Sequence, residues 1–562
     1  MWRGDSGSGQ RDSRFSALSS WQLVCSLWPM RLQLSLIHLV AWMCPLLAED
    51  AFTPGGTVAV TTPTAGAEGY DAIVRITDAP WIERELARFS AALGRDPKPL
   101  RKALAEALYH TSSLEAVDTS RPAVFVWRKG PAPLQAIIPI KADRRRQFIE
   151  EFGVMGSGEP PLVRVGDRDG TVVYSQNFPE GLREYRLLVS DSVAYLARNA
   201  DECRKLAANP GTLLPVLGGG VAPVSLTCSG EWMQANGLLS WAWSPRLPIQ
   251  QWMPGSALLD ATQNALLGQV ASATFEIRDG AGNRARLSAR LTARPDSELA
   301  AWIASQQNQA IRVQTQVGGA STAIKVAGHI SWQDKLEQVG RALVPVLAVV
   351  RGAEWTPVLE ESWVQALTTA QRSTDMVWLL DVPRVNSQVQ TLILEQPRAE
   401  EQLQQLEVVA SALVGAKSTP GTITGFPATC RSSKATSSRQ SLDQVLSATT
   451  RHVLLIDAWN LSPADALRWA EETARRLQQV AAPVGETAVV SVWCNLGRLV
   501  MLAPGIDTEV TIPEAIIQGT VRTAGVNVLN CEIQVPLAAA AQALSHLPDM
   551  HTAIGGGVKK VP

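Results

Sequence analysis

The amino-acid sequence predicts an α+β fold made of two tandem, related copies, each a largely antiparallel sheet with helices packed on one face. The first observation is that short apolar runs alternate with amphipathic runs of helical period. The second is that the order of these runs repeats once along the chain. The third is an alternation of apolar and polar residues in the last strand of each repeat, which is typical of a sheet with one packed face. The copies are expected at about 49–311 and 312–547.

Each copy is expected to begin with two extended segments that are followed by an amphipathic helix. The first extended segment reads AVFVW in one copy and MVWLL in the other, and both are rich in residues that favour strands. The three segments are 123–127, 134–140 and 143–152 in the first copy, and 376–380, 390–394 and 398–413 in the second.

The next helix of each copy has an N-terminal signature, and a short apolar strand precedes it at 193–197 and at 453–456. Asn199 is followed three residues later by Glu202, and Ser462 three residues later by Asp465. An Asn or Ser side chain at this position accepts a hydrogen bond from a free amide of the first turn. Both helices are therefore expected to start at these residues.

The end of each copy also corresponds. Strands at 224–228 and 490–494 end in Cys228 and Cys494, which are 266 residues apart. An alternating strand follows, and it leads into a helix. These strands and helices are 287–291 and 297–306 in the first copy, and 529–533 and 536–547 in the second.

The two copies differ most in the interval after these cysteines, where the first copy has 24 more residues. The surplus, near 230–254, is rich in tryptophan. Exposed indoles would form a platform that binds a glycan or a protein, because Trp combines a broad apolar face with one hydrogen-bond donor. Buried indoles would instead fill the core or the seam between the copies, which is the commoner role of Trp. The candidate binding residues are Trp232, Trp241, Trp243 and Trp252.

Residues 30–48 are predicted to be a secretory signal peptide. Met30 and Arg31 supply a positive start, and the apolar run 32–47 contains no Asp, Glu, Lys or Arg. This run has 16 residues, whereas a transmembrane helix needs about 20. Cleavage is expected after Ala48, so that the mature protein is periplasmic or secreted and has no stable membrane span.

The segments outside the two copies are expected to take no part in the fold. Residues 1–29 are polar and read as a leader upstream of a true start at Met30, and residues 548–562 read as a flexible tail. Cys44 follows Met43 rather than a small residue, which favours soluble release over a lipid anchor.

The order of strands and helices, including the segment RPAVFVWRKGPAPLQAIIPIKADRRRQFIEEFG at 121–153, resembles that of a loose group of uncharacterised secreted bacterial proteins with tandem α+β units. The resemblance covers most of the chain after residue 48 and contains no sharp motif. The resemblance transfers no catalytic residue to this chain, and it gives no reason to assume an enzyme activity.

Composition and motif spacing exclude several function classes. The chain has 51 basic and 52 acidic residues, a balance that argues against a nucleic-acid partner. Only five cysteines follow residue 48, too few for a disulfide scaffold. The histidines lack the spacing of metal ligands, and the glycine-rich runs lack the residues of a phosphate-binding loop. The segment 167–170 (DRDG) reads as a hairpin turn. We expect no cofactor and no metal.

Two function classes are compatible with these observations. The first is an exported, non-catalytic envelope or extracellular protein that binds an envelope protein or a polysaccharide. The second is a hydrolase of a cell-wall or extracellular polymer, because paired carboxylates need only two residues and no motif. The carboxylates near the Trp-rich interval are Glu231, Asp260 and Glu276. The sequence does not determine the oligomeric state.

Overall fold

The structure is a computed structural model. It describes residues 70–94, 96–128, 134–153, 162–178, 181–210, 222–235, 267–281, 283–311, 317–331, 356–370, 375–385, 387–396, 399–414, 419–434, 441–479, 487–502, 506 and 511–546. The predicted leader, signal peptide and tail lie outside these residues. Within them, no helix is both long and apolar enough to cross a membrane.

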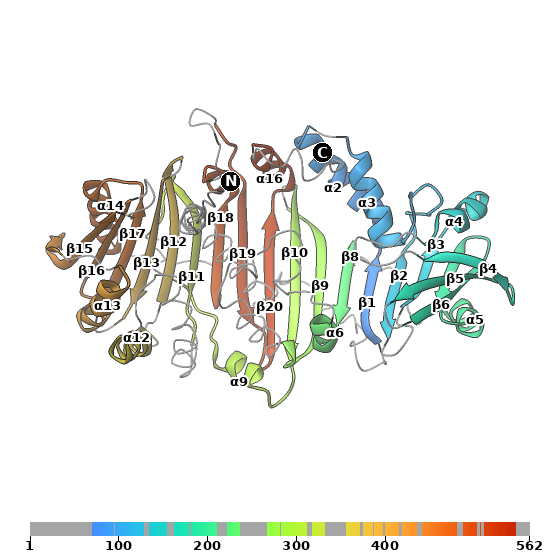
Figure 1. Cartoon of the computed structure of the whole chain (residues 1–562), viewed down its shortest axis with the longest axis horizontal. Helices are drawn as coiled ribbons and strands as arrows, with labels where there is room; N and C mark the ends of the chain where they lie inside the picture. Colours follow the sequence, from blue (N-terminus) through green and yellow to red (C-terminus); the bar gives the residue numbers. More distant parts are fainter. Residues whose placement is uncertain are drawn as a thin grey trace, which may run out of the picture.

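The described residues form a mixed helix and strand fold that is dominated by one antiparallel sheet of 20 strands (Figure 1). The strands of the first half are β1 (Tyr70–Ile76), β2 (Ala123–Arg128), β3 (Leu134–Pro139), β4 (Val163–Arg168), β5 (Thr171–Phe178), β6 (Gly181–Val189), β7 (Val193–Ala197), β8 (Val224–Cys228), β9 (Val270–Gly280) and β10 (Arg284–Ala293). Those of the second half are β11 (Thr322–Gly328), β12 (Asp375–Arg384), β13 (Ser387–Glu395), β14 (Thr419–Ile423), β15 (Phe426–Lys434), β16 (Ser441–Ala448), β17 (His452–Trp459), β18 (Val490–Asn495), β19 (Ile516–Thr523) and β20 (Val528–Val535).

Every strand pairing is antiparallel, and the pairings follow one order from edge to edge. The first half runs β4-β5-β6-β7-β3-β2-β1-β8-β9-β10. The second half, read from the other edge, runs β14-β15-β16-β17-β13-β12-β11-β18-β19-β20. Adding ten to each strand number of the first order gives the second order.

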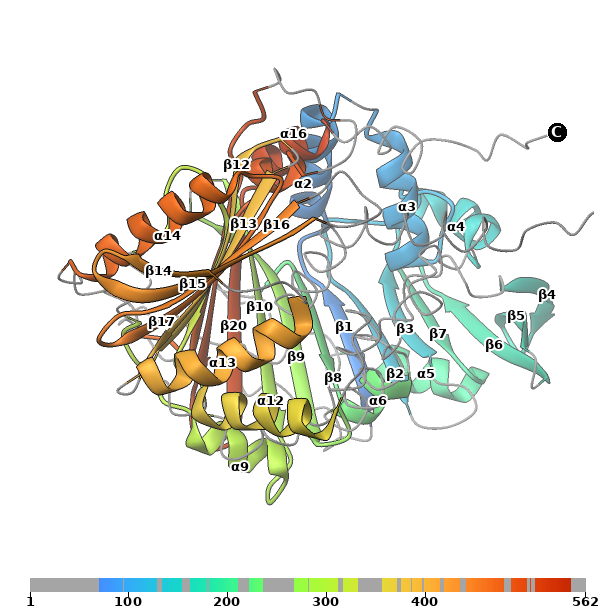
Figure 2. The same ribbon diagram turned by 60° about the vertical axis from the view of Figure 1, so that its left-hand side comes forward.

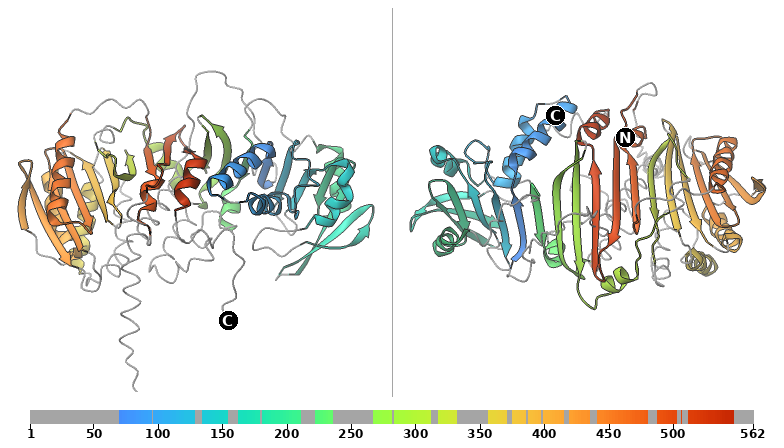
Figure 3. Two further views of the ribbon diagram at one scale, coloured as in Figure 1. Left: turned by 90° about the horizontal axis from the view of Figure 1, so that it is seen from above. Right: turned by 180° about the vertical axis from the view of Figure 1, so that it is seen from behind.

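Strands β10 and β20 join the two halves at the centre of the sheet. On one face of this seam Ala289 lies opposite Cys531, and Leu291 lies opposite Leu529. On the other face Arg286 donates to Glu532 across the seam at 2.7 Å. Apolar and polar side chains therefore alternate between the two faces as predicted, but the polar face is not open to solvent as expected, because Asn530 and Glu532 are buried. Figure 2 and Figure 3 show that the sheet twists strongly along its length, as paired strands normally do.

The helices lie between the strands in sequence. They are α2 (Ala79–Ala92), α3 (Lys98–Tyr109), α4 (Arg145–Glu151, after a 3₁₀ turn at Ala142–Arg144), α5 (Ala200–Ala208), α6 (Gly230–Ala235) and α9 (Glu298–Ser305) in the first half, and α12 (Pro357–Ala370), α13 (Ala399–Val414), α14 (Pro463–Leu477), α15 (Leu496–Val500) and α16 (Leu537–Leu544) in the second. The N-caps predicted for α5 and α14 are confirmed, because Asn199 accepts from the amide of Glu202 at 2.8 Å and Ser462 from that of Asp465 at 3.1 Å.

Helices cover both faces of the sheet in the first half, which differs from the single covered face that the sequence predicts. Phe148 of α4 packs in one cluster with Phe125 of β2. Leu206 of α5 packs in another cluster with Val124 and Val126 of the same strand. Neighbouring residues of a strand point to opposite faces, so α4 and α5 lie on opposite sides. The prediction of one covered face rests on strands β10 and β20, which carry polar residues on one face. Strand β2 is apolar on both faces, so both of its faces can pack against helices.

The hairpin predicted at residues 167–170 is confirmed, and it forms one wall of the cleft described below. Arg168 of β4 pairs with Thr171 of β5, so the turn consists of Asp169 and Gly170 alone. Both have positive φ values, 55° and 74°. A two-residue hairpin turn needs this left-handed backbone, which Asp and Gly adopt at low cost.

Candidate functional site: an arginine cleft in the first half

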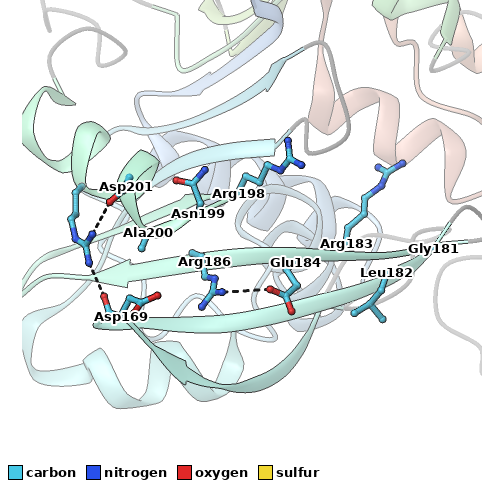
Figure 4. Close-up of a pocket in the computed structure, with 11 residues that line it drawn as sticks. Asp169, Gly181, Leu182, Arg183, Glu184, Arg186, Arg198, Asn199, Ala200 and Asp201 are labelled. Atoms are coloured by element: carbon cyan, nitrogen blue, oxygen red, sulfur yellow. Dashed lines mark hydrogen bonds and ion pairs between the residues drawn. The ribbon is translucent and has the colours of Figure 1, made fainter.

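A cleft of about 890 Å³ opens near the β4 edge of the sheet. Its walls come from the first part of β6, the start of α5 and the turn between β4 and β5 (Figure 4). The residues that line it are Asp169, Gly181, Leu182, Arg183, Glu184, Arg186, Arg198, Asn199, Ala200, Asp201 and Arg204. Four of these carry a guanidinium and three a carboxyl group, so the lining has a net positive charge.

Arg186 is the most deeply placed of the four arginines. Its side chain is only 10% exposed, and its Nη2 lies 3.5 Å from a carboxylate oxygen of Glu184. Its Nη1 is buried without a hydrogen-bond partner. Its backbone carbonyl accepts from the thiol of Cys203 of α5 at 3.1 Å, which fixes this part of β6 against the helix. A buried guanidinium with an unused donor is costly, and an acceptor in the cleft would relieve that cost.

Arg198 lies at the mouth of the cleft, between the end of β7 and the cap of α5. It is exposed and makes no hydrogen bond or ion pair with the part of the chain that the structure describes. Figure 4 shows its side chain and that of Arg183 of β6 extending in the same direction. An exposed guanidinium has five donors in a planar fork, which matches the oxygens of a carboxylate, sulfate or phosphate.

Arg204 has a different role, because its donors are used within the protein. It donates to the carboxylate of Asp201 at 2.8 Å and to the backbone carbonyl of Asp169 at 2.9 Å. These bonds connect α5 to the hairpin turn and hold the wall of the cleft. Asp201 and Glu202 also offset the positive end of the α5 dipole. Anion binding here would therefore depend on Arg183, Arg186 and Arg198 rather than on the helix terminus.

The position of the second half that corresponds to Arg186 is occupied by an apolar residue. The last residue pair of β6 and β7 is Val189 with Ala194, and that of β16 and β17 is Ala448 with Val453. Counting back three pairs from each places Val445 where the first half has Arg186. Val445 is 3% exposed and lies in the apolar core with α14. Within the part of the second half that the structure describes, an apolar core residue thus replaces the central arginine of the cleft.

The tryptophans predicted as a binding platform are only partly covered by the structure. Trp232 is on α6, where it is half-buried and packs against Trp127 of β2 with the ring centroids 5.8 Å apart. It does not line the arginine cleft. Trp241, Trp243 and Trp252 lie outside the described residues.

The carboxylates proposed for a hydrolase do not line the arginine cleft either. Glu231 of α6 forms an ion pair with Arg294 at 2.9 Å, and Glu276 of β9 forms one with Arg278 at 2.8 Å. The two acids thus pair with separate arginines, and Asp260 lies outside the described residues. Among the described residues, no group of three or more His, Cys, Asp or Glu side chains is placed to hold a metal ion.

Sequence reasoning missed the arginine cleft because its residues come from β6, the segment after β7 and a hairpin turn. A local signal existed in the run GLREYRLLV at 181–189, where two arginines and one glutamate occur in a strand that ends in three apolar residues. Comparison of the chain with protein-family models, with curated proteins and with solved structures gives no match.

Proposed function

We propose that this chain is an exported, non-catalytic binding protein whose arginine cleft binds an acidic polysaccharide. The observation that carries the proposal is the buried Arg186 with an unpartnered Nη1, in a cleft that the exposed Arg198 also lines. The lining is polar and contains no aromatic side chain, whereas protein interfaces rely on aromatic anchors. Two of its carboxylates, Glu184 and Asp201, form ion pairs with arginines, which suits a binding role.

The proposal predicts that Arg186→Gln weakens the binding of polygalacturonate, a carboxylate-bearing polysaccharide, by about tenfold or more. A hydrogen bond to a charged group contributes roughly 1.5–3 kcal/mol, and about 1.4 kcal/mol corresponds to a tenfold change in affinity. Isothermal titration calorimetry of the full chain measures this. Binding should also weaken as salt is added, since exposed guanidinium groups are screened.

Arg146→Gln is the matched control, because Arg146 is 93% exposed on α4 and, among the described residues, pairs only with the neighbouring Glu150. The affinity of this variant for polygalacturonate should equal that of the native chain. Neither protein should bind neutral dextran. Equal affinities of the two variants would contradict the cleft as the site. Tighter binding of poly-glutamate than of polygalacturonate would assign the cleft to an acidic protein instead.

We propose export on the basis of the charge-free run at 32–47, and the mature protein is then expected to begin near Glu49 outside the cytoplasm. N-terminal sequencing of the protein from fractionated cells measures both points. Recovery of a chain with Met1 or Met30 intact in the cytosolic fraction would overturn this proposal. The resemblance to exported tandem α+β proteins stays a prediction of the same kind.

We further propose that the two halves are copies of one ancestral unit. The repeated pairing order of the strands supports this. The arrangement of the helices supports it as well, because a half-turn about the seam, within the plane of Figure 1, brings α5 near α14 and α4 near α13. Two glycines, one in each of the helices that follow β8 and β18, also support a common origin of the halves. A Cβ on Gly230 would lie 2.4 Å from the carbonyl oxygen of Leu267, and one on Gly497 would lie 2.2 Å from that of Pro513. Superposition of the two halves in a crystal structure checks the proposal.

A further inference from the structure

A second cavity, of about 380 Å³, lies in the second half. It is bounded by the loop 317–321, by β12 and by one face of α14, far along the sheet from the arginine cleft. Its volume falls within the range of about 300–1,000 Å³ that small-molecule sites have. The side chains that matter for the argument are Ser321, Asp381, Trp469, Glu472, Arg476 and Arg498.

The inner wall of this cavity holds a buried carboxyl group, that of Asp381. Asp381 is 3% exposed and accepts from the hydroxyls of Thr322 at 2.7 Å and Ser321 at 3.3 Å. Burial raises the pKa of Asp381, although these hydrogen bonds oppose the rise. The nearby Lys325 has its pKa lowered by burial, and the charge of Asp381 opposes that change.

The rim of the cavity carries charges of both signs. Arg476 binds Glu472 and the carbonyl oxygen of Gly318, which holds the loop against α14. Arg498 of α15 makes one weak contact to the sulfur of Met501, with Nη1 and sulfur 3.7 Å apart. Hydrogen-bond donors and acceptors therefore surround a space that one half-buried indole, that of Trp469, also lines.

We propose that this cavity binds a neutral sugar ring. Its two guanidinium and two carboxyl groups balance in charge, so the lining attracts neither a net anion nor a net cation. A sugar presents hydroxyl groups around its edge and C–H groups on its faces. The hydroxyls suit the carboxyl groups and guanidinium groups of the lining, and a C–H face suits the indole of Trp469.

Among the described residues, the position of the first half that corresponds to Asp381 holds no carboxyl group. The bulges at the starts of β1 and β11 match, since Tyr70 pairs with Arg128 in one half and Thr322 with Asp381 in the other. Arg128 thus stands where the second half has the buried carboxyl group. The two halves are therefore specialised for different ligands, and the sugar site does not depend on the arginine cleft.

Saturation-transfer NMR of the full chain with glucose, galactose, mannose and N-acetylglucosamine tests the assignment. At least one of these sugars should show transfer and a millimolar dissociation constant. Arg498→Gln should weaken that sugar by about tenfold while leaving the thermal transition in place, because Arg498 has little part in the packing. Asp381→Asn should weaken it equally if the variant folds.

Arg186→Gln is the matched control, and it should leave sugar binding unchanged, which separates this proposal from that for the cleft. The assignment is overturned if none of the four sugars shows transfer. It is also overturned if folded Arg498→Gln binds as well as the native chain, or if glycine or alanine binds more tightly than every sugar, since that would indicate a zwitterion site.

Discussion

Replacing Phe148 by Ala is expected to lower the free energy of unfolding by about 3–5 kcal/mol. Phe148 is fully buried, and its ring centroid lies 5.5 Å from that of Phe152. It is the side chain through which the short helix α4 packs against Phe125 and Ile138 of the sheet. The variant loses the burial of a whole phenyl ring, and the rigid strands beneath it cannot move in to fill the space.

Chemical denaturation followed by circular dichroism measures this loss as a shift of the midpoint. Val163→Ala is the control, because Val163 is 57% exposed on the edge strand β4 and should change stability by no more than about 0.5 kcal/mol. A loss below about 1 kcal/mol for the Phe148 variant would mean that α4 does not pack on the sheet as described.

Acid is expected to destabilise the fold through His110, by about 3 kcal/mol between pH 7 and pH 4. Burial lowers the pKa of this imidazole to about 4, from an ordinary value of 6.5. In this pH range the unfolded chain binds a proton at His110 that the folded chain does not bind. The free energy of unfolding therefore decreases as the pH falls from about 6.5 to about 4. The stability is fully present above that window and is lost within it.

His110→Asn should remove most of this dependence on pH. His110 ends α3 with a φ of 54°, a left-handed conformation that Asn adopts more readily than most residues, so the backbone is preserved. Denaturation midpoints at the two pH values measure the difference. Ile138→Val is a control that loses stability equally at both. If the Asn variant keeps the full acid sensitivity, another buried group causes it.

Local sequence signals sufficed for the elements of this fold wherever a helix or strand depends on its own residues. The caps at Asn199 and Ser462 are an example, because the hydrogen bond that starts each helix joins residues only three positions apart. The matching strands β8 and β18 are another, although β18 extends one residue beyond Cys494, to Asn495. The hairpin turn at Asp169 and Gly170 follows in the same way from residues that tolerate positive φ.

The candidate sites could not be predicted in this way. Arg186 and Arg198 are 12 positions apart and line one cleft only because β6 pairs with β7. The cavity around Asp381 needs α14 and the loop 317–321, which lies some 60 residues before Asp381 in the chain. The interval 230–254 is predicted as a binding site because its tryptophan content can be read directly from the sequence. The convergence of charged side chains in space cannot be read in this way.

The sequence by itself determined the alternating elements, their helix caps and the repeated order of segments, since each depends on contacts between residues near one another in the chain. Only the tertiary structure decided that helices cover both faces of the first half and that the two halves join through β10 and β20. It also decided which polar side chains converge on the cleft and the cavity. Such choices depend on strand pairing across hundreds of residues, whose energy is invisible to local periodicity.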